Sequence, residues 1–339
     1  MNKIFYFYFS HKNLLNDVTS VYVKAVEEAV VDLGYVVEYV YDIEAIPRGA
    51  NVFTITDKCN YKVLKKCKPR VCVNWYQGIV PEEAALTYEG KWSRYPRKWY
   101  HSYLEKYTLK RNSLNIVVSN AMRDHYSRKY GLNLDNWFVM PCFNCSLDEK
   151  SFGVERYAKP TFVYAGSMAK WQCVEQTVSV FKRLKQQLPA AELYIYTREK
   201  DQARQIAESM GVEINIDSMS PEALNQRMKQ FKYGLLFRDN ISVNNVATPT
   251  KINNYMACGL IPVFSDVVED YKAVSCQNPY MITFNGEDDF IRKVVEFEQE
   301  SIDASKILDA HRFTFRTYWN IPQYKTVLKK ELGKILSEK

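Results

Sequence analysis

Residues 248–262 read Thr-Pro-Thr-Lys-Ile-Asn-Asn-Tyr-Met-Ala-Cys-Gly-Leu-Ile-Pro and form the most informative stretch of the chain. The pattern predicts a helix that opens at Lys251, ends at Gly259 and leads into a buried strand over residues 260–264. The first turn of a helix leaves backbone N–H groups without partners at the positive end of its dipole. A lysine beside those groups adds a full charge, so the stretch predicts an anion site that suits a phosphate.

Strand-like and helix-like segments alternate on both sides of this stretch. Strands are predicted at residues 3–9, 36–41, 52–56, 70–75, 115–119, 138–139, 161–165, 192–197, 212–216, 233–237 and 260–264. Helices are predicted at 18–33, 121–130 with Asn120 as N-cap, 174–188, 201–210, 221–231 with Ser220 as N-cap, 288–299 and 322–337. Such alternation predicts an α/β fold in which helices cover both faces of parallel sheets.

The chain has 339 residues, which is long for one core, so two domains are expected. The polar residues 148–160 suggest the boundary between two tandem doubly wound, Rossmann-like domains that face a central cleft. No window has the roughly 20 apolar residues of a membrane span. The N-terminus resembles a strand more than a secretion signal, which favours the cytoplasm. Cys142 and Cys145 form a lone C-x-x-C, which favours free thiols over a zinc site.

The formal net charge is +7, with lysine and arginine concentrated in residues 58–70, 91–111 and the C-terminal tail. No nucleic-acid-binding motif accompanies this charge, so nucleic acid is not the expected partner. Residues 88–107 mix basic and aromatic side chains, which suits the anionic inner face of a membrane or a lipid-diphosphate acceptor. A helical connector with a basic solvent face is the alternative that the pattern favours.

Candidate groups follow several predicted strands of the second half, where the carboxyl ends of parallel strands share one edge of the sheet. Cations and a helix N-terminus that converge there would suit a diphosphate. For Lys170 and Arg198 a solvated surface position is equally compatible with the sequence, whereas Arg238 and Lys251 border apolar runs that do not need a charge. The set is Gly166, Ser167, Lys170, Arg198, Arg238, Thr248, Thr250 and Lys251.

Three segments of the second half resemble the donor-binding domain of GT-B glycosyltransferases, close to the large retaining family four (glycosyl transferases group 1). They are residues 162–170, 234–238 and 249–262, and the last is the most specific. The resemblance implies that Lys170, Arg238 and Lys251 are the catalytic cations that stabilise the leaving diphosphate, with Ser167 in place of the family's arginine. It also implies residues 1–152 as the acceptor-binding domain, 153–315 as the donor domain and 316–339 as a helix that crosses back.

Two positions depart from the family pattern, which usually has two glutamates eight positions apart. Here Val246 and Asn254 stand at those positions. Asn254 can still bond a ribose hydroxyl, whereas Val246 cannot replace a carboxylate, so Asn244 or Asn245 is expected to contact the donor sugar. The resemblance places the base and ribose near Ser218 and Met219.

The resemblance assigns the acceptor to the first half, where a strand end carries Trp75, Tyr76 and Gln77, followed by Glu82. Aromatic rings pack on the apolar faces of sugars, and carboxylates accept their hydroxyls. Packing under the loop is an equal alternative for Trp75 and Tyr76. Glu82 and Glu83 also suit the start of a helix after Pro81, since acids stabilise helix N-termini.

The resulting hypothesis is a glycosyltransferase that moves a sugar from a nucleotide diphosphate sugar to a saccharide or lipid-linked acceptor. The resemblance implies retention at the anomeric carbon, no metal or other cofactor, and a role in bacterial surface polysaccharide synthesis. A sugar-nucleotide epimerase of the same fold and a non-catalytic nucleotide-sugar-binding subunit remain as alternatives, and Val246 is the main support for the latter.

Overall fold

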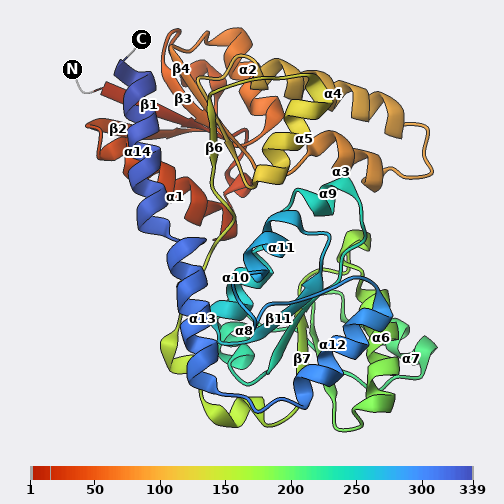
Figure 1. The fold of residues 1–339 in the computed structure, drawn as a ribbon. Helices are drawn as coiled ribbons and strands as arrows, with labels where there is room; N and C mark the ends of the chain where they lie inside the picture. Colours follow the sequence, from red (N-terminus) through yellow and green to blue (C-terminus); the bar gives the residue numbers. More distant parts are fainter. Residues whose placement is uncertain (1–2, 16, 338–339) are drawn as a thin grey trace. The chain divides into compact units, whose positions relative to one another are not determined.

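The computed structural model describes residues 3–15 and 17–337, which form two compact units (Figure 1). The first unit contains the described residues up to Cys142, the short segment Val246–Thr248 and the described residues from Asn320 onward. The second unit contains Phe143–Asn245 and Pro249–Trp319. Each unit is built around its own six-stranded parallel sheet, which confirms the predicted pair of doubly wound α/β folds.

The first sheet has the strand order β2-β1-β3-β4-β5-β6. Helices cover both of its faces, so consecutive residues of a strand are buried rather than alternate ones. In β1, for example, Phe5, Tyr6, Phe7 and Tyr8 are all buried. The strands are β1 (Lys3–Tyr8), β2 (Tyr35–Val40), β3 (Asn51–Thr54), β4 (Val71–Tyr76), β5 (Leu114–Val117) and β6 (Trp137–Val139).

Six α-helices belong to the described part of the first unit. They are α1 (Asp17–Val31), α2 (Asp57–Lys66), α3 (Val80–Thr87), α4 (Arg94–Leu109), α5 (Asn120–Tyr130) and α14 (Ile321–Ser337), with 3-10 turns at Lys12–Leu14 and Ile43–Ala45. The last helix packs along the first (Figure 1), and its Lys329 pairs over 3.2 Å with Asp32, the residue that follows α1. The predicted N-cap Asn120 is wrong, because the preceding Ser119 is extended and its hydroxyl accepts from Met122 N over 2.8 Å.

The second sheet has the order β12-β11-β10-β7-β8-β9, so its winding reverses between β7 and β10. This is the order of a dinucleotide-binding Rossmann sheet. The strands are β7 (Thr161–Ala165), β8 (Glu192–Tyr196), β9 (Asn215–Asp217), β10 (Tyr233–Leu236), β11 (Ile261–Ser265) and β12 (Ile282–Phe284). The predicted strand 212–216 begins too early, because Val212 N still closes the end of the preceding helix by donating to Ala207 O over 3.0 Å.

The helices of the second unit pack on both faces of this sheet (Figure 1). They are α6 (Val174–Gln187), α7 (Lys200–Met210), α8 (Pro221–Met228), α9 (Ser242–Asn245), α10 (Thr250–Ala257), α11 (Glu269–Ser275), α12 (Glu287–Glu298) and α13 (Ala304–Thr317), with 3-10 turns at Glu149–Ser151, Val154–Tyr157 and Lys170–Gln172. Ser220 caps α8 as predicted, since its hydroxyl accepts from Ala223 N. A core of apolar and aromatic side chains, including Phe162, Phe181 and Tyr233, fixes the positions of the strand ends.

Candidate functional site

The reversal between β7 and β10 determines which loops of the second unit gather at one place. In doubly wound sheets, ligands bind outside the carboxyl ends of the strands at such a point. Gly166 and Ser167 directly follow β7, and Arg238 comes two residues after β10. Residues from both sides of the reversal therefore lie within reach of one ligand.

Lys251 and Arg238 meet at a single oxygen atom in the side chain of Gln172. Lys251 Nζ donates to Gln172 Oε1 over 2.9 Å, and Arg238 Nη2 donates to the same oxygen over 2.8 Å. Tyr164 OH also reaches this oxygen, at 3.2 Å. Two cations thus share one uncharged acceptor, and within residues 3–15 and 17–337 neither is paired with a carboxylate. We refer to Lys251 and Arg238 as the cation pair.

The Arg238 guanidinium is held firmly in place. It is buried, and its Nη1 donates to the carbonyl oxygens of Trp171 at 3.0 Å and Phe237 at 3.1 Å. Its backbone N–H donates to Ser265 Oγ at 2.9 Å. Such a preset guanidinium loses little conformational entropy when an anion replaces a neutral partner.

Burial, together with the neighbouring Arg238, lowers the pKa of Lys251 to about 7. Burial also lowers the pKa of Arg238. A lysine with such a pKa is only partly charged at neutral pH, and an anion within hydrogen-bonding distance favours the charged form. Both shifts therefore mark a position where the fold concentrates positive charge that a bound anion would stabilise.

Gly166 leaves room for the lysine. Its φ angle is +155°, and a Cβ atom at this position would lie 2.6 Å from Lys251 Cε and 3.1 Å from Tyr164 OH. Any other residue would displace the Lys251 ammonium or the tyrosine hydroxyl. The glycine predicted from sequence is thus needed for the close approach of β7 to α10.

The helix α10 starts at Thr250, one residue earlier than predicted. Pro249 occupies the N-cap position and no side chain caps the helix. Ile252 N donates to Pro249 O over 3.3 Å, and the positive dipole end of the helix lies beside Lys251 without a side-chain cap.

Five predicted donor-binding residues line one cavity of about 360 Å³ in the second unit. They come from the loops after β7, β8 and β9, and we call this space the second-unit cavity. Its polar wall includes Thr197, whose hydroxyl donates to Glu199 Oε2 over 2.7 Å. The lining residues are Gly166, Ser167, Tyr196, Thr197, Arg198, Glu199, Ser218, Met219 and Leu224.

Other predicted residues of the donor site have structural partners. Asn244 is buried and donates to Asp239 O over 2.9 Å, and Asn245 donates to Asn240 Oδ1 over 2.9 Å. Thr248 belongs to the first unit, where its hydroxyl accepts from Cys142 N over 3.0 Å. These amides and this hydroxyl hold loops in place, and their predicted contacts to the donor stay predictions.

The remaining predicted cations and hydroxyls are more open. Lys170 is exposed at the start of its 3-10 turn, and Arg198 is exposed at the rim of the second-unit cavity. Thr250 is half-buried as the first residue of α10. The residue that joins the cation pair, Gln172, lies two positions after Lys170 and carries no sequence signal of its own.

The two positions that depart from the family pattern differ in their surroundings. Asn254 lies one helical turn after Lys251, and its Oδ1 is buried without a hydrogen-bond partner among the described residues. Val246 is buried, and its carbonyl oxygen accepts from Ser119 Oγ over 2.5 Å within the first unit. Asn254 therefore retains an unused polar atom, whereas Val246 offers only packing.

The first unit has its own cavity, of about 330 Å³, at the carboxyl ends of β3 and β4. Tyr76 and Gln77, predicted from sequence, line it. We call this space the first-unit cavity. Its lining residues are Asn13, Leu14, Thr19, Ile55, Thr56, Asp57, Tyr76, Gln77, Gly78, Val80 and Glu83.

Two predicted acceptor residues lie elsewhere. Trp75 is fully buried against the Tyr22 ring, with 4.9 Å between centroids, so the structure favours the packing alternative. Glu82 begins α3 and pairs with Lys129 Nζ over 2.9 Å. The helix-start alternative thus describes Glu82, while Glu83 of the same turn faces the first-unit cavity.

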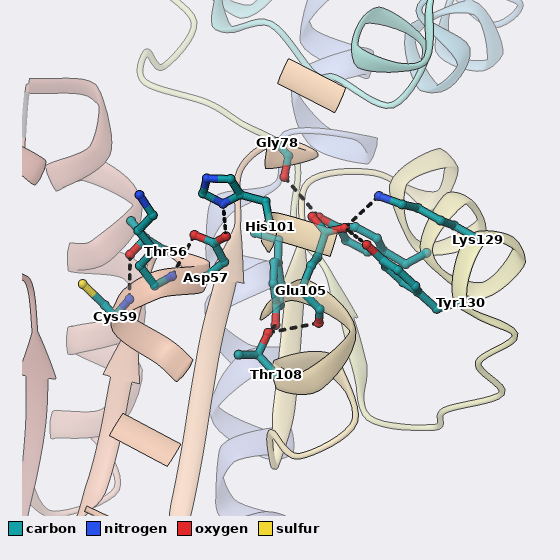
Figure 2. Close-up of polar contacts among 12 residues, drawn as sticks. Thr56, Asp57, Cys59, Gly78, His101, Glu105, Thr108, Lys129 and Tyr130 are labelled. Carbon is teal, nitrogen blue, oxygen red and sulfur yellow. Dashed lines mark hydrogen bonds and ion pairs between the residues drawn. The ribbon is translucent and has the colours of Figure 1, made fainter. Parts of the chain in front are cut away.

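Asp57 is the charged group of the first-unit cavity that the sequence analysis missed (Figure 2). It is buried at the start of α2, and its Oδ2 lies 2.6 Å from His101 Nδ1 on α4. Burial, with help from Glu82 and Asp57, raises the pKa of Glu83. No short motif connects residues 57, 83 and 101, so only the fold could bring them together.

A second polar cluster ties α4 to α5 (Figure 2). Glu105 is fully buried on α4 and accepts from Tyr130 OH at 2.6 Å and from Lys129 Nζ at 3.2 Å. Burial raises the pKa of Glu105 to about 7, and Lys129 opposes this shift. The cluster fixes the inward face of α4.

No protein-family model and no curated protein matches the sequence. The structure, in contrast, matches solved proteins. A glycosyltransferase from Rickettsia africae matches with a TM-score of 0.62 and 12% identity over 100% of both chains. WaaG, a glycosyltransferase involved in lipopolysaccharide biosynthesis, matches with a TM-score of 0.61 and 12% identity, over 96% of this chain and 99% of its own. The chain has the GT-B fold.

A third GT-B protein extends further than this chain. A mutant of S. aureus TarM, in complex with fondaparinux, alpha-GlcNAc-glycerol and UDP, matches with a TM-score of 0.61 and 13% identity over 90% of the chain. The chain spans 58% of that TarM chain, so the likeness concerns only that share of it. At these identities the three matches establish the fold, and the chemistry must be argued from the residues.

Two kinds of feature are absent from the part of the chain that the structure describes. Within residues 3–15 and 17–337, no three His, Cys, Asp or Glu side chains are grouped so as to hold a metal ion. Over the same residues, no helix has the length and apolar character required to cross a membrane.

Proposed function

We propose that the chain is a glycosyltransferase whose second unit binds the donor, a nucleotide diphosphate sugar. The observation that carries this proposal is the cation pair, in which Lys251 and Arg238 share the neutral Gln172 oxygen without a carboxylate. A diphosphate oxygen in place of this amide oxygen would convert two ordinary hydrogen bonds into charge-assisted ones. The GT-B fold and the open start of α10 support the same ligand.

The rest of the donor fits the surroundings of the cation pair. The second-unit cavity adjoins Gly166 and Ser167 and offers Met219, Leu224 and polar side chains to a nucleoside. The unpaired Asn254 Oδ1 can accept a ribose hydroxyl. The solved TarM complex contains UDP, which supports a nucleotide as ligand without naming the base here.

In the proposed reaction the acceptor hydroxyl approaches the anomeric carbon on the face from which the diphosphate departs. Its oxygen bonds to this carbon as the bond to the diphosphate breaks, and its proton passes to the departing diphosphate. Negative charge then grows on the departing diphosphate, where Lys251, Arg238 and the dipole of α10 would stabilise it. We further propose retention at the anomeric carbon and transfer without a metal.

The acceptor is proposed to be a saccharide or lipid-linked saccharide bound by the first-unit cavity. Gln77 and the carboxylates of Asp57 and Glu83 supply donors and acceptors for sugar hydroxyls, whereas the buried Tyr76 hydroxyl bonds to Thr108 Oγ1 over 2.8 Å. Because WaaG is involved in lipopolysaccharide biosynthesis, we propose bacterial surface polysaccharide synthesis as the first pathway to examine.

The test is a thermal-shift screen of UDP-, GDP- and ADP-sugars, followed by calorimetry with the best ligand. Lys251→Ala is expected to weaken binding about ten- to hundredfold, the value of a lost charge-assisted hydrogen bond. Lys306→Ala, which removes an exposed lysine on α13, is the control and should bind as the wild type does. Equal affinity of the Lys251→Ala and wild-type proteins would overturn the diphosphate role.

Product analysis separates the alternatives. A transferase releases nucleoside diphosphate and a glycosylated acceptor, whereas an epimerase yields an isomerised sugar. The buried Val246 favours a non-catalytic binding subunit as the second candidate. Clear binding of a donor with no turnover on any acceptor would select that candidate.

A further inference from the structure

A row of exposed aromatic side chains runs along one side of α4 and the turn before it. Their spacing of three, four and four residues places them on one face of a helix. Trp92 is 82% exposed, Tyr95 67% and Trp99 74%, and Tyr103 continues the row. We call these four residues the aromatic stripe, and such a group of large exposed rings indicates an interaction surface.

Most of the stripe does not serve the packing of α4, since Tyr103 alone of the four rings is described against another helix, at Tyr61 of α2. The opposite face of the helix buries Leu104, Glu105, Thr108 and Leu109. Glu105 on that face bonds to Lys129 and Tyr130 of α5, so the helix cannot rotate to bury the stripe without breaking this cluster. The fold therefore presents the aromatic rings to the exterior.

Positive charge accompanies the stripe. Residues 90–111 contain seven lysines and arginines, and their only acid is the fully buried Glu105. Arg97 and Lys98 are exposed beside Trp99, and Lys106 follows one to two turns later. Lys62 and Lys65 extend the positive surface onto α2, where the Tyr61 and Tyr103 ring centroids lie 6.0 Å apart.

We propose that the aromatic stripe docks this chain onto an anionic lipid bilayer. Tryptophan and tyrosine rings are amphipathic and favour the headgroup region, while lysine and arginine are attracted to anionic lipids. Residues 90–111 combine both features and expose no acid, with Glu89 as the nearest exposed carboxylate in the chain, so this surface complements a lipid surface in charge and in polarity.

Single-stranded nucleic acid also favours basic and aromatic surfaces but fits the geometry less well. Its binding sites are grooves in which bases stack on separated rings. Here the rings project from a helix, and Trp99 and Tyr103 stack on each other at 6.5 Å between centroids and 19° between planes. The docking proposal does not depend on the donor site, so either can fail alone.

The experiment is flotation of the full chain with vesicles of phosphatidylcholine alone or with about one-third phosphatidylglycerol. Wild type should float with the anionic vesicles at low salt and dissociate as salt rises. The variant Trp92→Ser/Trp99→Ser is expected to bind about tenfold or more weakly, and Lys98→Glu several-fold more weakly. Phe313→Ser and Lys306→Glu, both at exposed positions on α13, are the matched controls and should float as wild type does.

Quenching by brominated lipid adds a local readout, because Trp92 and Trp99 are the expected contacts. Wild-type fluorescence should be quenched, and quenching should be lost in Trp92→Phe/Trp99→Phe, which keeps aromatic rings. Equal flotation of wild type and Trp92→Ser/Trp99→Ser would overturn the proposal. It would also be overturned by binding to a single-stranded RNA oligonucleotide in place of vesicles, or by a vesicle-independent dimer that the double variant abolishes.

Discussion

The two units place opposite charges at corresponding positions of similar sheets. At the carboxyl end of the second sheet, Lys251 and Arg238 converge on a neutral oxygen. At the carboxyl end of the first sheet, Asp57 and Glu83 line the first-unit cavity, which is similar in volume to the second-unit cavity. Burial raises the pKa of Glu83 there. Because parallel sheets bring loops together in the same way, the fold supplies the location and the loop residues determine which ligand binds.

The largest effect on ligand binding is expected from Gly166→Ala, which would disrupt the cation pair of the second unit. The added Cβ would lie 2.6 Å from Lys251 Cε, so the lysine must move away from the Gln172 oxygen. Nucleotide affinity in calorimetry should fall about hundredfold, the effect of a lost charge-assisted bond together with backbone strain. Gly153→Ala is the matched control, because no atom lies within 4 Å of a Cβ there. Equal affinities would refute the positioning role of Gly166.

The second effect concerns protein stability and the buried Glu105, which ties α4 to α5 in the first unit. The pKa of Glu105 is raised to about 7 from an unperturbed 4.5, so the native state holds its proton more tightly than the unfolded chain does. Stability is therefore lost as pH rises from 4.5 to 7, by up to about 3 kcal/mol. Urea unfolding of Glu105→Gln should show a smaller decline over this range.

The control for this titration is Glu175→Gln, which alters an exposed carboxylate on α6. Its stability profile should follow that of the wild type between pH 4.5 and 7. If Glu105→Gln did so as well, the buried carboxylate would not be the titrating group.

The two sheets differ in how far their chemistry could be predicted from the sequence. The run 161–165 and the glycine after it predicted β7 correctly, and Gly166, Ser167 and Arg198 were predicted together because parallel strand ends share an edge. Gln172 was missed because it lies in an unpredicted 3-10 turn, which ends at Cys173 in the left-handed conformation with φ 52°. A non-glycine residue in this conformation has no sequence signature.

The residues of the first-unit cavity were harder to predict from the sequence. Asp57 begins a helix that was not predicted, and its partner His101 lies 44 residues away on another helix. The run 70–75 predicted β4 but not which of Trp75 and Tyr76 would line the first-unit cavity, since both faces of this sheet are covered and both rings are buried. Trp75 and Tyr76 therefore differ in role because of their positions in the sheet.

A third, smaller effect should appear in the protonation of the cation pair. Lys251 has a pKa of about 7 without ligand, and a diphosphate would raise it. Binding at pH 8 should therefore take up close to one proton, and affinity should decline by at most about tenfold per pH unit above 7. Calorimetry in two buffers of different ionisation enthalpy measures this uptake. Lys251→Met should abolish it, and persistent uptake in that variant would assign the proton to another group.

The smallest effect is expected from Asp57→Asn, which tests whether the two sheet ends act separately. The hydrogen bonds of Asp57 lie within the first unit, so donor affinity should stay within about twofold of wild type. The KM for the acceptor should rise, since a carboxylate that accepts hydroxyls is lost. A large fall in donor affinity would show that the two sites are coupled.

The amide of Gln172 has a consequence for how the second unit discriminates among anions. A glutamate at this position would neutralise the cation pair and require an incoming ligand to compete with a resident charge. A ligand oxygen with more negative charge than the amide oxygen can instead displace it from Lys251 and Arg238. The affinity for anions should therefore increase with the charge of the ligand. A nucleoside diphosphate should therefore bind much better than the corresponding monophosphate, and after transfer the more highly charged product would dissociate more slowly than the sugar nucleotide that replaces it.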